Sequence, residues 1–275
     1  FSAIKDAIGS LRGSYALVIM NEKEPDKIYV VRRGGSPLVV GEGANERLVA
    51  SDVPALLPYT KDMIFLEDGD FAVLDSKGID IRDEMGEKVV RKIQHIPWTP
   101  LMAERGGYKH FMLKEIFEQS EVVEDAVTGR IDYVNNTVTL DEVNSLFDGH
   151  SPLFNKITIV ACGTSWHAAL VGRYFIESFA KIPVSVELAS EFRYRGPLID
   201  NKTLIIPISQ SGETADTLAA LRLAKEMGAK VLAICNVVGS SITRSADATL
   251  YTHAGPEIGV ASTKAFTAQL VVLYL

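Results

Sequence analysis

The sequence predicts an α/β protein whose second half forms a doubly wound parallel sheet and whose first half forms a mostly antiparallel sheet. The chain has 275 residues, which at roughly 150 residues per domain indicates about two domains. From residue 155, apolar strand-like runs alternate with helical patterns, whereas residues 10–95 hold short apolar runs separated by turns. The formal net charge is −9 over residues 1–150 and +2 over residues 151–275, so the halves also differ in composition.

In the first half, apolar runs bounded by turn residues predict short strands. We expect them at 14–20, 27–32, 37–41, 63–66 and 70–75. Residues 21–26 and 33–37 are turns by composition. Residues 51–57 predict one short helix, with Ser51 or Asp52 as its cap and Pro54 in its first turn. A further segment, 96–110, contains two prolines and a glycine pair and is expected to be a linker.

In the second half, the pattern predicts helices and buried parallel strands. A helix is expected over 111–128, and a second over 214–227, ended by Gly228 at its C′ position. The strands are expected at 156–161, 184–188, 203–208, 231–235 and 248–252. Pro207 does not fit the interior of a core strand, because proline cannot donate to the ladder.

Two turns that follow predicted parallel strands are rich in hydroxyl groups. Residues 162–167 (CGTSWH) follow the first strand, and residues 209–214 (SQSGET) follow the third. Ligands of doubly wound sheets bind at such strand-to-helix turns, where backbone N–H groups and the helix dipole favour anions. The alternative is that these Ser and Thr residues are ordinary helix caps. Two such turns together favour a phosphate site.

The kind of phosphate ligand is narrowed by motifs that the chain lacks. It has no Gly-x-x-x-x-Gly-Lys-Ser/Thr sequence, which argues against a P-loop nucleotidase. The pair Gly41 and Gly43 is followed by Glu46 where a dinucleotide fingerprint needs its third glycine. The two turns offer hydroxyl and amide groups but no lysine. This combination suits a small polar ligand that carries one monoester phosphate.

Four blocks of the second half resemble a known family. They are 162–165 (CGTS), 189–195 (ASEFRYR), 209–217 (SQSGETADT) and 257–266 (EIGVASTKAF), and in this order they resemble the first sugar isomerase (SIS) domain of the glutamine–fructose-6-phosphate aminotransferases. The first half is similar to the later part of that family's class II glutaminase domain. The blocks that carry this similarity are 11–16 (LRGSYA), 35–38 (GSPL), 50–52 (ASD) and 65–70 (FLEDGD).

The resemblance implies a domain plan. Residues 1–95 would be the C-terminal part of a class II glutamine amidotransferase domain of Ntn-type α+β fold, and 96–110 a linker. Residues 111–148 would be a helical lead-in, and 149–275 a flavodoxin-like first SIS domain, truncated at its C-terminal end. Because residue 1 is Phe and the chain stops inside an apolar helix-like run, we expect an internal piece of a longer protein.

The resemblance also implies a reaction and a site. Members hydrolyse glutamine in one domain and pass ammonia to the other, where fructose 6-phosphate becomes glucosamine 6-phosphate. Carried over, the phosphosugar ligands are Thr164, Ser165, Ser209, Gln210, Ser211, Thr214, Val260 and Ser262. Neither a metal nor an organic cofactor is implied, and a cytoplasmic homodimer is expected.

The chain departs from the family in ways that limit this expectation. The family's nucleophile is an N-terminal cysteine, whereas residue 1 here is Phe and no cysteine precedes Cys162. The isomerising Lys, Glu and His of the family belong to a second SIS domain or lie further on. We therefore expect no catalytic residue in this chain, and binding of a phosphosugar without a complete reaction.

Two rival functions and several exclusions accompany this interpretation. A non-catalytic SIS-domain phosphosugar sensor, or an SIS-type sugar-phosphate isomerase or deaminase, would not need the segment 10–95.

The excess of 35 acidic over 28 basic residues argues against a nucleic-acid partner, and no apolar run suits a membrane span or secretory signal. Two cysteines indicate a reduced, cytosolic chain.

Several side chains near the expected site have a structural explanation. Cys162 is expected to be a packed thiol, and His167 a packing or surface residue rather than an acid–base catalyst. Glu213 is expected in the first turn of the following helix, where its carboxylate would interact favourably with the positive end of the helix dipole. For Lys264, contact with a phosphate and simple solvation are both expected alternatives.

Overall fold

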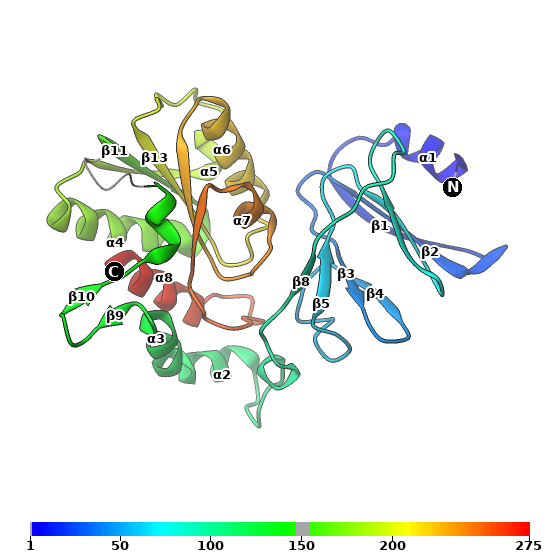
Figure 1. Cartoon of the computed structure of the whole chain (residues 1–275), viewed down its shortest axis with the longest axis horizontal. Helices are drawn as coiled ribbons and strands as arrows, with labels where there is room; N and C mark the ends of the chain where they lie inside the picture. The colour runs from blue at the N-terminus through cyan, green and yellow to red at the C-terminus, as the bar shows by residue number, and fades with distance from the viewer. Residues whose placement is uncertain (1, 147–153) are drawn as a thin grey trace. The chain divides into compact units, whose positions relative to one another are not determined.

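The computed structural model describes residues 2–146 and 154–275, and the end of the expected lead-in and the start of the expected SIS domain (147–153) lie outside them. The chain divides into two compact units, Phe1–His95 and Ile96–Leu275 (Figure 1). Each unit has its own core.

The first unit contains two four-stranded antiparallel sheets, with strand orders β1-β2-β6-β7 and β4-β3-β5-β8. Its elements are α1 (Ser2–Gly9), β1 (Tyr15–Asn21), β2 (Glu24–Arg33), β3 (Val39–Glu42), β4 (Arg47–Ala50), β5 (Asp62–Phe65), β6 (Phe71–Asp75), β7 (Gly78–Arg82) and β8 (Ile93–His95). The predicted antiparallel character is confirmed. The strands form two sheets rather than one, and β4, β7, β8 and α1 were not predicted.

The alternation of side chains along β2 explains how this unit is layered. Val30 points into a core shared with residues of the second sheet, such as Val40 and Ile64. Its neighbours Tyr29 and Val31 point to the opposite face, where the apolar side of α1 covers them. Strand β2 is therefore buried on both faces, whereas the edge strand β1 exposes Val18 and Met20.

The helix expected over 51–57 is wrong. Residues 51–59 form bends and turns, yet Val53, Leu56 and Leu57 are buried. The apolar spacing that suggested a helix instead reflects side chains anchoring an irregular loop to the core. The turn expected over 21–26 is also shorter than predicted, because β2 already begins at Glu24.

The second unit is built on a five-stranded parallel sheet of order β12-β11-β13-β14-β15. Its strands are β11 (Lys156–Ala161), β12 (Val184–Leu188), β13 (Thr203–Ser209), β14 (Lys230–Cys235) and β15 (Ala248–Tyr251). All five predicted parallel strands are confirmed to within one residue at each end. Pro207 is tolerated because the pairing of β13 with β14 skips residues 206 and 207, where no ladder bond to β14 is needed.

Helices cover both faces of this sheet, as a doubly wound fold requires (Figure 1). On one face lie α4 (Gly163–Phe179) and α8 (Lys264–Tyr274), and on the other α5 (Ala189–Phe192), α6 (Ala215–Glu226) and α7 (Ser241–Ser245). The predicted helix over 214–227 is α6, and Gly228 follows its end with φ +89°.

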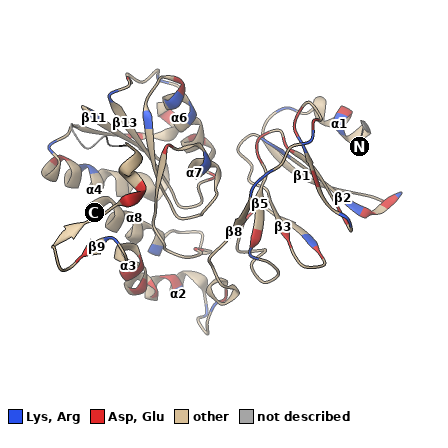
Figure 2. Cartoon of the chain, in the orientation of Figure 1, with Lys and Arg blue, Asp and Glu red and all other residues tan. Residues whose placement is uncertain are grey.

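The segment before the sheet is only partly helical. The expected helix over 111–128 is present as α2 (Phe111–Phe117) and α3 (Gln119–Val127), joined at Glu118. The hairpin of β9 (Ile131–Asp132) and β10 (Thr137–Val138) follows, and then the 3₁₀ helix η2 (Asp141–Leu146). The expected linker contains another 3₁₀ helix, η1 (Pro100–Ala103). Figure 2 shows carboxylates gathered along α2 and α3.

Candidate functional site

The two hydroxyl-rich turns lie at the switch point of the parallel sheet. From β11 the chain moves outward to β12 and then returns to the other side of β11 as β13. Because Val160 pairs with Pro207, the carboxyl ends of β11 and β13 are neighbours at one edge. The turns 162–167 and 209–214 therefore open side by side where ligands of doubly wound sheets bind.

The first turn begins the 17-residue helix α4. Cys162 is its N-cap residue and makes no side-chain cap hydrogen bond, and Gly163 has φ +58°. Thr164 is exposed, whereas Ser165 is 8% exposed. From α8, the buried Gln269 donates from Nε2 to Ser165 Oγ at 3.0 Å. This bond occupies a lone pair of Ser165 and leaves its hydroxyl hydrogen available for an acceptor in the turn.

The second turn is held together by its own hydroxyl groups. Ser209 Oγ accepts from the Gly212 N–H at 3.0 Å and lies 3.0 Å from Thr214 Oγ1. Ser211 Oγ accepts from the Glu213 N–H at 3.2 Å. Gln210 is half-buried, and its carbonyl accepts from the Asn236 N–H at 3.3 Å. These bonds fix the side chains of Ser209, Ser211 and Thr214, whereas Gln210 is held through its backbone.

Helix capping does not account for these hydroxyls. Thr214 is the N-cap residue of α6, but its side chain makes no cap hydrogen bond and instead contacts Ser209. Cys162 leaves the start of α4 without a side-chain cap in the same way. The first N–H groups of both helices are therefore open to an anion.

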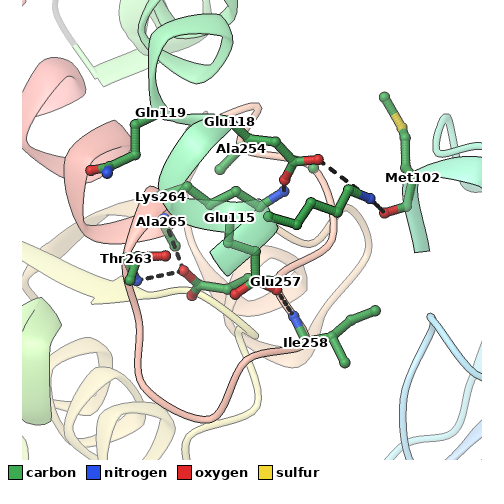
Figure 3. Close-up of polar contacts among 12 residues, drawn as sticks. Met102, Glu115, Glu118, Gln119, Ala254, Glu257, Ile258, Thr263, Lys264 and Ala265 are labelled. Atoms are coloured by element: carbon green, nitrogen blue, oxygen red, sulfur yellow. Dashed lines mark hydrogen bonds and ion pairs between the residues drawn. The ribbon is translucent and has the colours of Figure 1, made fainter. Parts of the chain in front are cut away.

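Glu213 and Lys264 have roles other than those expected. Glu213 precedes α6, and its carboxylate accepts from the N–H and hydroxyl of Ser241 at 2.7 and 2.8 Å, so it caps α7. Lys264 is 3% exposed, and its Nζ lies 2.7 Å from Glu118 Oε2 (Figure 3). The lysine is buried and ion-paired, so the expectation of simple solvation is wrong, while its contact with a phosphate stays untested.

Val260 and Ser262 lie in the irregular loop 252–263, which joins β15 to α8. Val260 is fully exposed and Ser262 is half-buried. The loop leaves the same sheet edge as the two turns, since β15 runs parallel to β11 and β13. Their place near the sugar stays a prediction.

The remaining candidate side chains behave as packing or surface groups. Cys162 is half-buried against the core formed with α5 and α6, and His167 is exposed, with Nδ1 3.0 Å from the Gly163 carbonyl. Burial raises the pKa of the Cys235 thiol to about 11. Among residues 2–146 and 154–275, no group of three or more His, Cys, Asp or Glu could hold a metal ion. Nor does any helix in these ranges have the length and apolar character to cross a membrane.

Sequence reasoning missed three buried polar residues that shape this edge: Gln269, Asn236 and Glu115. Gln269 interrupts the apolar run of α8, and Asn236 directly follows β14, so a polar residue inside an apolar pattern could have found both. Glu115 gives no such signal, because it lies among the charged residues of an amphipathic helix.

Comparison with known proteins assigns the parallel-sheet unit. Residues 154–275 match the model of the SIS domain family. This part of the chain is therefore similar to a SIS domain. Among solved structures, the C-terminal domain of glucosamine-fructose-6-phosphate aminotransferase from Francisella tularensis is 47% identical, with a TM-score of 0.56. That similarity covers 62% of this chain and 47% of the other.

The resemblance extends beyond the SIS domain to nearly the whole chain. The glutamine–fructose-6-phosphate aminotransferases of Clostridium acetobutylicum and Symbiobacterium thermophilum are 52% and 54% identical over 273 residues, or 99% of this chain. The enzyme of Thermococcus kodakarensis is 53% identical. The chain spans 44% of the length of each of these relatives. The resemblance inferred from the sequence blocks is confirmed.

Proposed function

We propose that the chain is part of an enzyme that converts fructose 6-phosphate and glutamine to glucosamine 6-phosphate and glutamate. Its contribution would be to bind the phosphosugar. The observation that carries this proposal is the pair of uncapped, hydroxyl-lined turns at the switch point of a SIS domain. Relatives along 99% of the chain bear the name of that enzyme, which favours it over a phosphosugar sensor.

The turns offer the chemistry that a monoester phosphate needs. The open N–H groups of α4 and α6 would bind phosphate oxygens, with hydroxyl donors around them and the Gln210 amide at the rim. The proposed ligands are Thr164, Ser165, Ser209, Gln210, Ser211 and Thr214, with Val260 and Ser262 toward the sugar. Since Lys264 is paired with Glu118, backbone dipoles and hydroxyls would carry the binding.

The first unit would belong to the glutaminase part of the same enzyme, as the later portion of a class II domain with an Ntn-type fold. Its two antiparallel sheets and similarity to the relatives support this assignment. Ammonia released from glutamine would be used at the sugar. We assign no catalytic residue to this chain, and the intact enzyme would be a cytoplasmic homodimer.

The site is tested by titrating the chain calorimetrically with fructose 6-phosphate, and with fructose as the ligand without phosphate. The double variant Ser209→Ala/Ser211→Ala is expected to weaken binding of the phosphosugar roughly 30- to 100-fold. Each lost hydrogen bond is worth about 1 kcal/mol, and about 1.5 kcal/mol where the acceptor is charged. Ser178→Ala, on the exposed side of α4, is the matched control. Unchanged affinity in a folded double variant would mean that the second turn serves only to begin α6.

A further inference from the structure

The loop 252–263 has no helix or strand of its own, yet hydrogen bonds to buried or half-buried side chains hold its backbone. At its start, Asn236 accepts from the Ala254 N–H at 2.8 Å and donates from Nδ2 to the Gly255 carbonyl at 2.6 Å. At its end, Glu257 Oε1 accepts from the N–H groups of Thr263 and Ala265 at 2.8 and 3.2 Å. The loop is therefore fixed at both ends.

The middle of the loop is held by Glu115, which reaches it from α2 (Figure 3). Glu115 is 2% exposed, and its Oε1 accepts from the N–H groups of Ile258 and Gly259 at 2.7 and 2.9 Å. These two residues immediately precede Val260. A buried carboxylate that accepts two backbone N–H bonds fixes the local course of the chain strongly, because such bonds are charge-assisted.

Gly259 is matched to this carboxylate. Its φ does not lie in the left-handed region, so backbone conformation does not require a glycine there. A Cβ atom added at this position would collide with Glu115 Oε2 and would lie 3.4 Å from Met112 Cα. The glycine therefore supplies the space through which the carboxylate approaches the loop.

A buried charge network anchors the helix that carries Glu115. Lys114 Nζ donates to the carbonyls of Met102 and Glu104 at 2.8 and 2.5 Å and lies 3.3 Å from Glu118 Oε1. The other oxygen of Glu118 accepts from Lys264 at the start of α8. This network joins η1, α2 and α8, so Glu115 is presented to the loop from a fixed position.

We propose that Glu115 is a positioning residue of the sugar site, which shapes the loop 252–263 so that Val260 and Ser262 face the bound phosphosugar. This inference rests on the proposed function. Glu115 touches no substrate; it acts through the backbone of residues 258 and 259. Gly259 is its partner, and the two residues form one unit.

The test is a double-mutant cycle with fructose 6-phosphate affinity and amide hydrogen exchange as readouts. Glu115→Ala and Gly259→Ala are each expected to weaken binding about tenfold and to accelerate exchange at residues 258–260. The double variant should be no weaker than Glu115→Ala alone, since without the carboxylate the added methyl group has room. Glu115→Gln keeps an acceptor oxygen and should retain most of the affinity. Glu124→Ala, on the exposed side of α3, is the control.

Each outcome decides the inference. Faster exchange with unchanged affinity would overturn it, as would losses that simply add in the double variant, while the proposed function would stand. If the unmodified chain bound no phosphosugar, the proposed function would fall and the inference with it. Should Glu115→Ala not fold, Gly259→Ala and Glu115→Gln still predict opposite results.

Discussion

The Cys235 thiol is fully buried at the end of β14, and this burial raises its pKa to about 11. Only the thiolate reacts with alkylating reagents, so at pH 8 the folded protein should be modified at Cys162 and not at Cys235. Mass spectrometry after brief exposure to iodoacetamide checks this. In urea both cysteines should react. Equal modification of the two in the folded protein would contradict the burial of Cys235.

The same thiol makes stability depend on pH. Its folded pKa, about 11, exceeds the ordinary value of 9.0, so its contribution is fully present below pH 9 and is lost as pH rises through 11. The unfolding free energy should fall by at most about 1.4 kcal/mol per pH unit in this window. Urea titrations at pH 8 and 10.5 measure it. Cys235→Ala removes this dependence, which separates it from the titration of other groups.

Gln269 is expected to control the direction of the Ser165 hydroxyl group. Its amide donates to Ser165 Oγ, which leaves the hydroxyl hydrogen for the phosphate of the proposed site. Gln269→Glu would place a carboxylate there, and the hydroxyl would donate to it instead. We expect phosphosugar affinity to fall about tenfold, the loss of one charge-assisted hydrogen bond. Calorimetric titration measures this, and an unaltered affinity would remove Ser165 from the ligand set.

At the scale of elements, the turn between β13 and α6 depends on the close approach of α7. Gly212 has φ +67°, and a Cβ atom there would collide with Ser240 Oγ and lie 2.8 Å from Cys235 Sγ. Gly212→Ala should therefore destabilise the protein by about 2 to 4 kcal/mol, combining backbone strain with overpacking.

Gly228 provides a matched comparison for this prediction. Its φ is +89°, but nothing lies within 4 Å of an added Cβ atom. Gly228→Ala should cost only about 1 kcal/mol. Urea unfolding of both variants measures the difference. Equal losses would mean that backbone conformation, and not the contact with α7, sets the requirement at Gly212.

The sequence predicted those elements whose signal is local. The parallel strands are continuous apolar runs because both of their faces are covered, and they were found almost to the residue. Strands β4, β7 and β8 were missed, since they are only three to five residues long and their side chains are mostly half-buried or exposed. The false helix over 51–57 arose because an anchored loop can share the spacing of a helix.

The same limit applies to the candidate site. The two hydroxyl turns could be found because each is contiguous in the chain and follows a recognisable strand. Glu115 and the pairing of Lys264 could not, because their partners lie 143 and 146 residues away. Partners so distant are brought together only by the tertiary fold.

At the scale of the whole molecule, the two units have separate cores, and both tryptophans, Trp98 and Trp166, belong to the second. In the first unit, Arg91 pairs with the fully buried Asp70 at 2.7 Å. Arg91→Ala would leave that carboxylate unpaired at a cost of about 3 to 5 kcal/mol. We expect circular dichroism to report earlier thermal unfolding, while tryptophan fluorescence reports an unchanged transition.

A control variant and a contrary outcome belong to this prediction. Lys92→Ala, next to Arg91 but exposed, is the control and should leave both transitions in place. If Arg91→Ala shifts the fluorescence transition together with the circular dichroism, the two units unfold as one cooperative body.

The contacts that hold the loop 252–263 also determine when this part of the fold can form during biosynthesis. Glu115 leaves the ribosome 143 residues before Ile258, and Glu118 leaves it 146 residues before Lys264. At about 5 to 20 residues per second, these carboxylates wait on the order of ten seconds for their partners. During that interval the contacts of Glu115 with the loop and of Glu118 with Lys264 are missing. We therefore expect the proposed sugar site to be complete, and a phosphosugar to be bound, only after α8 has been synthesised.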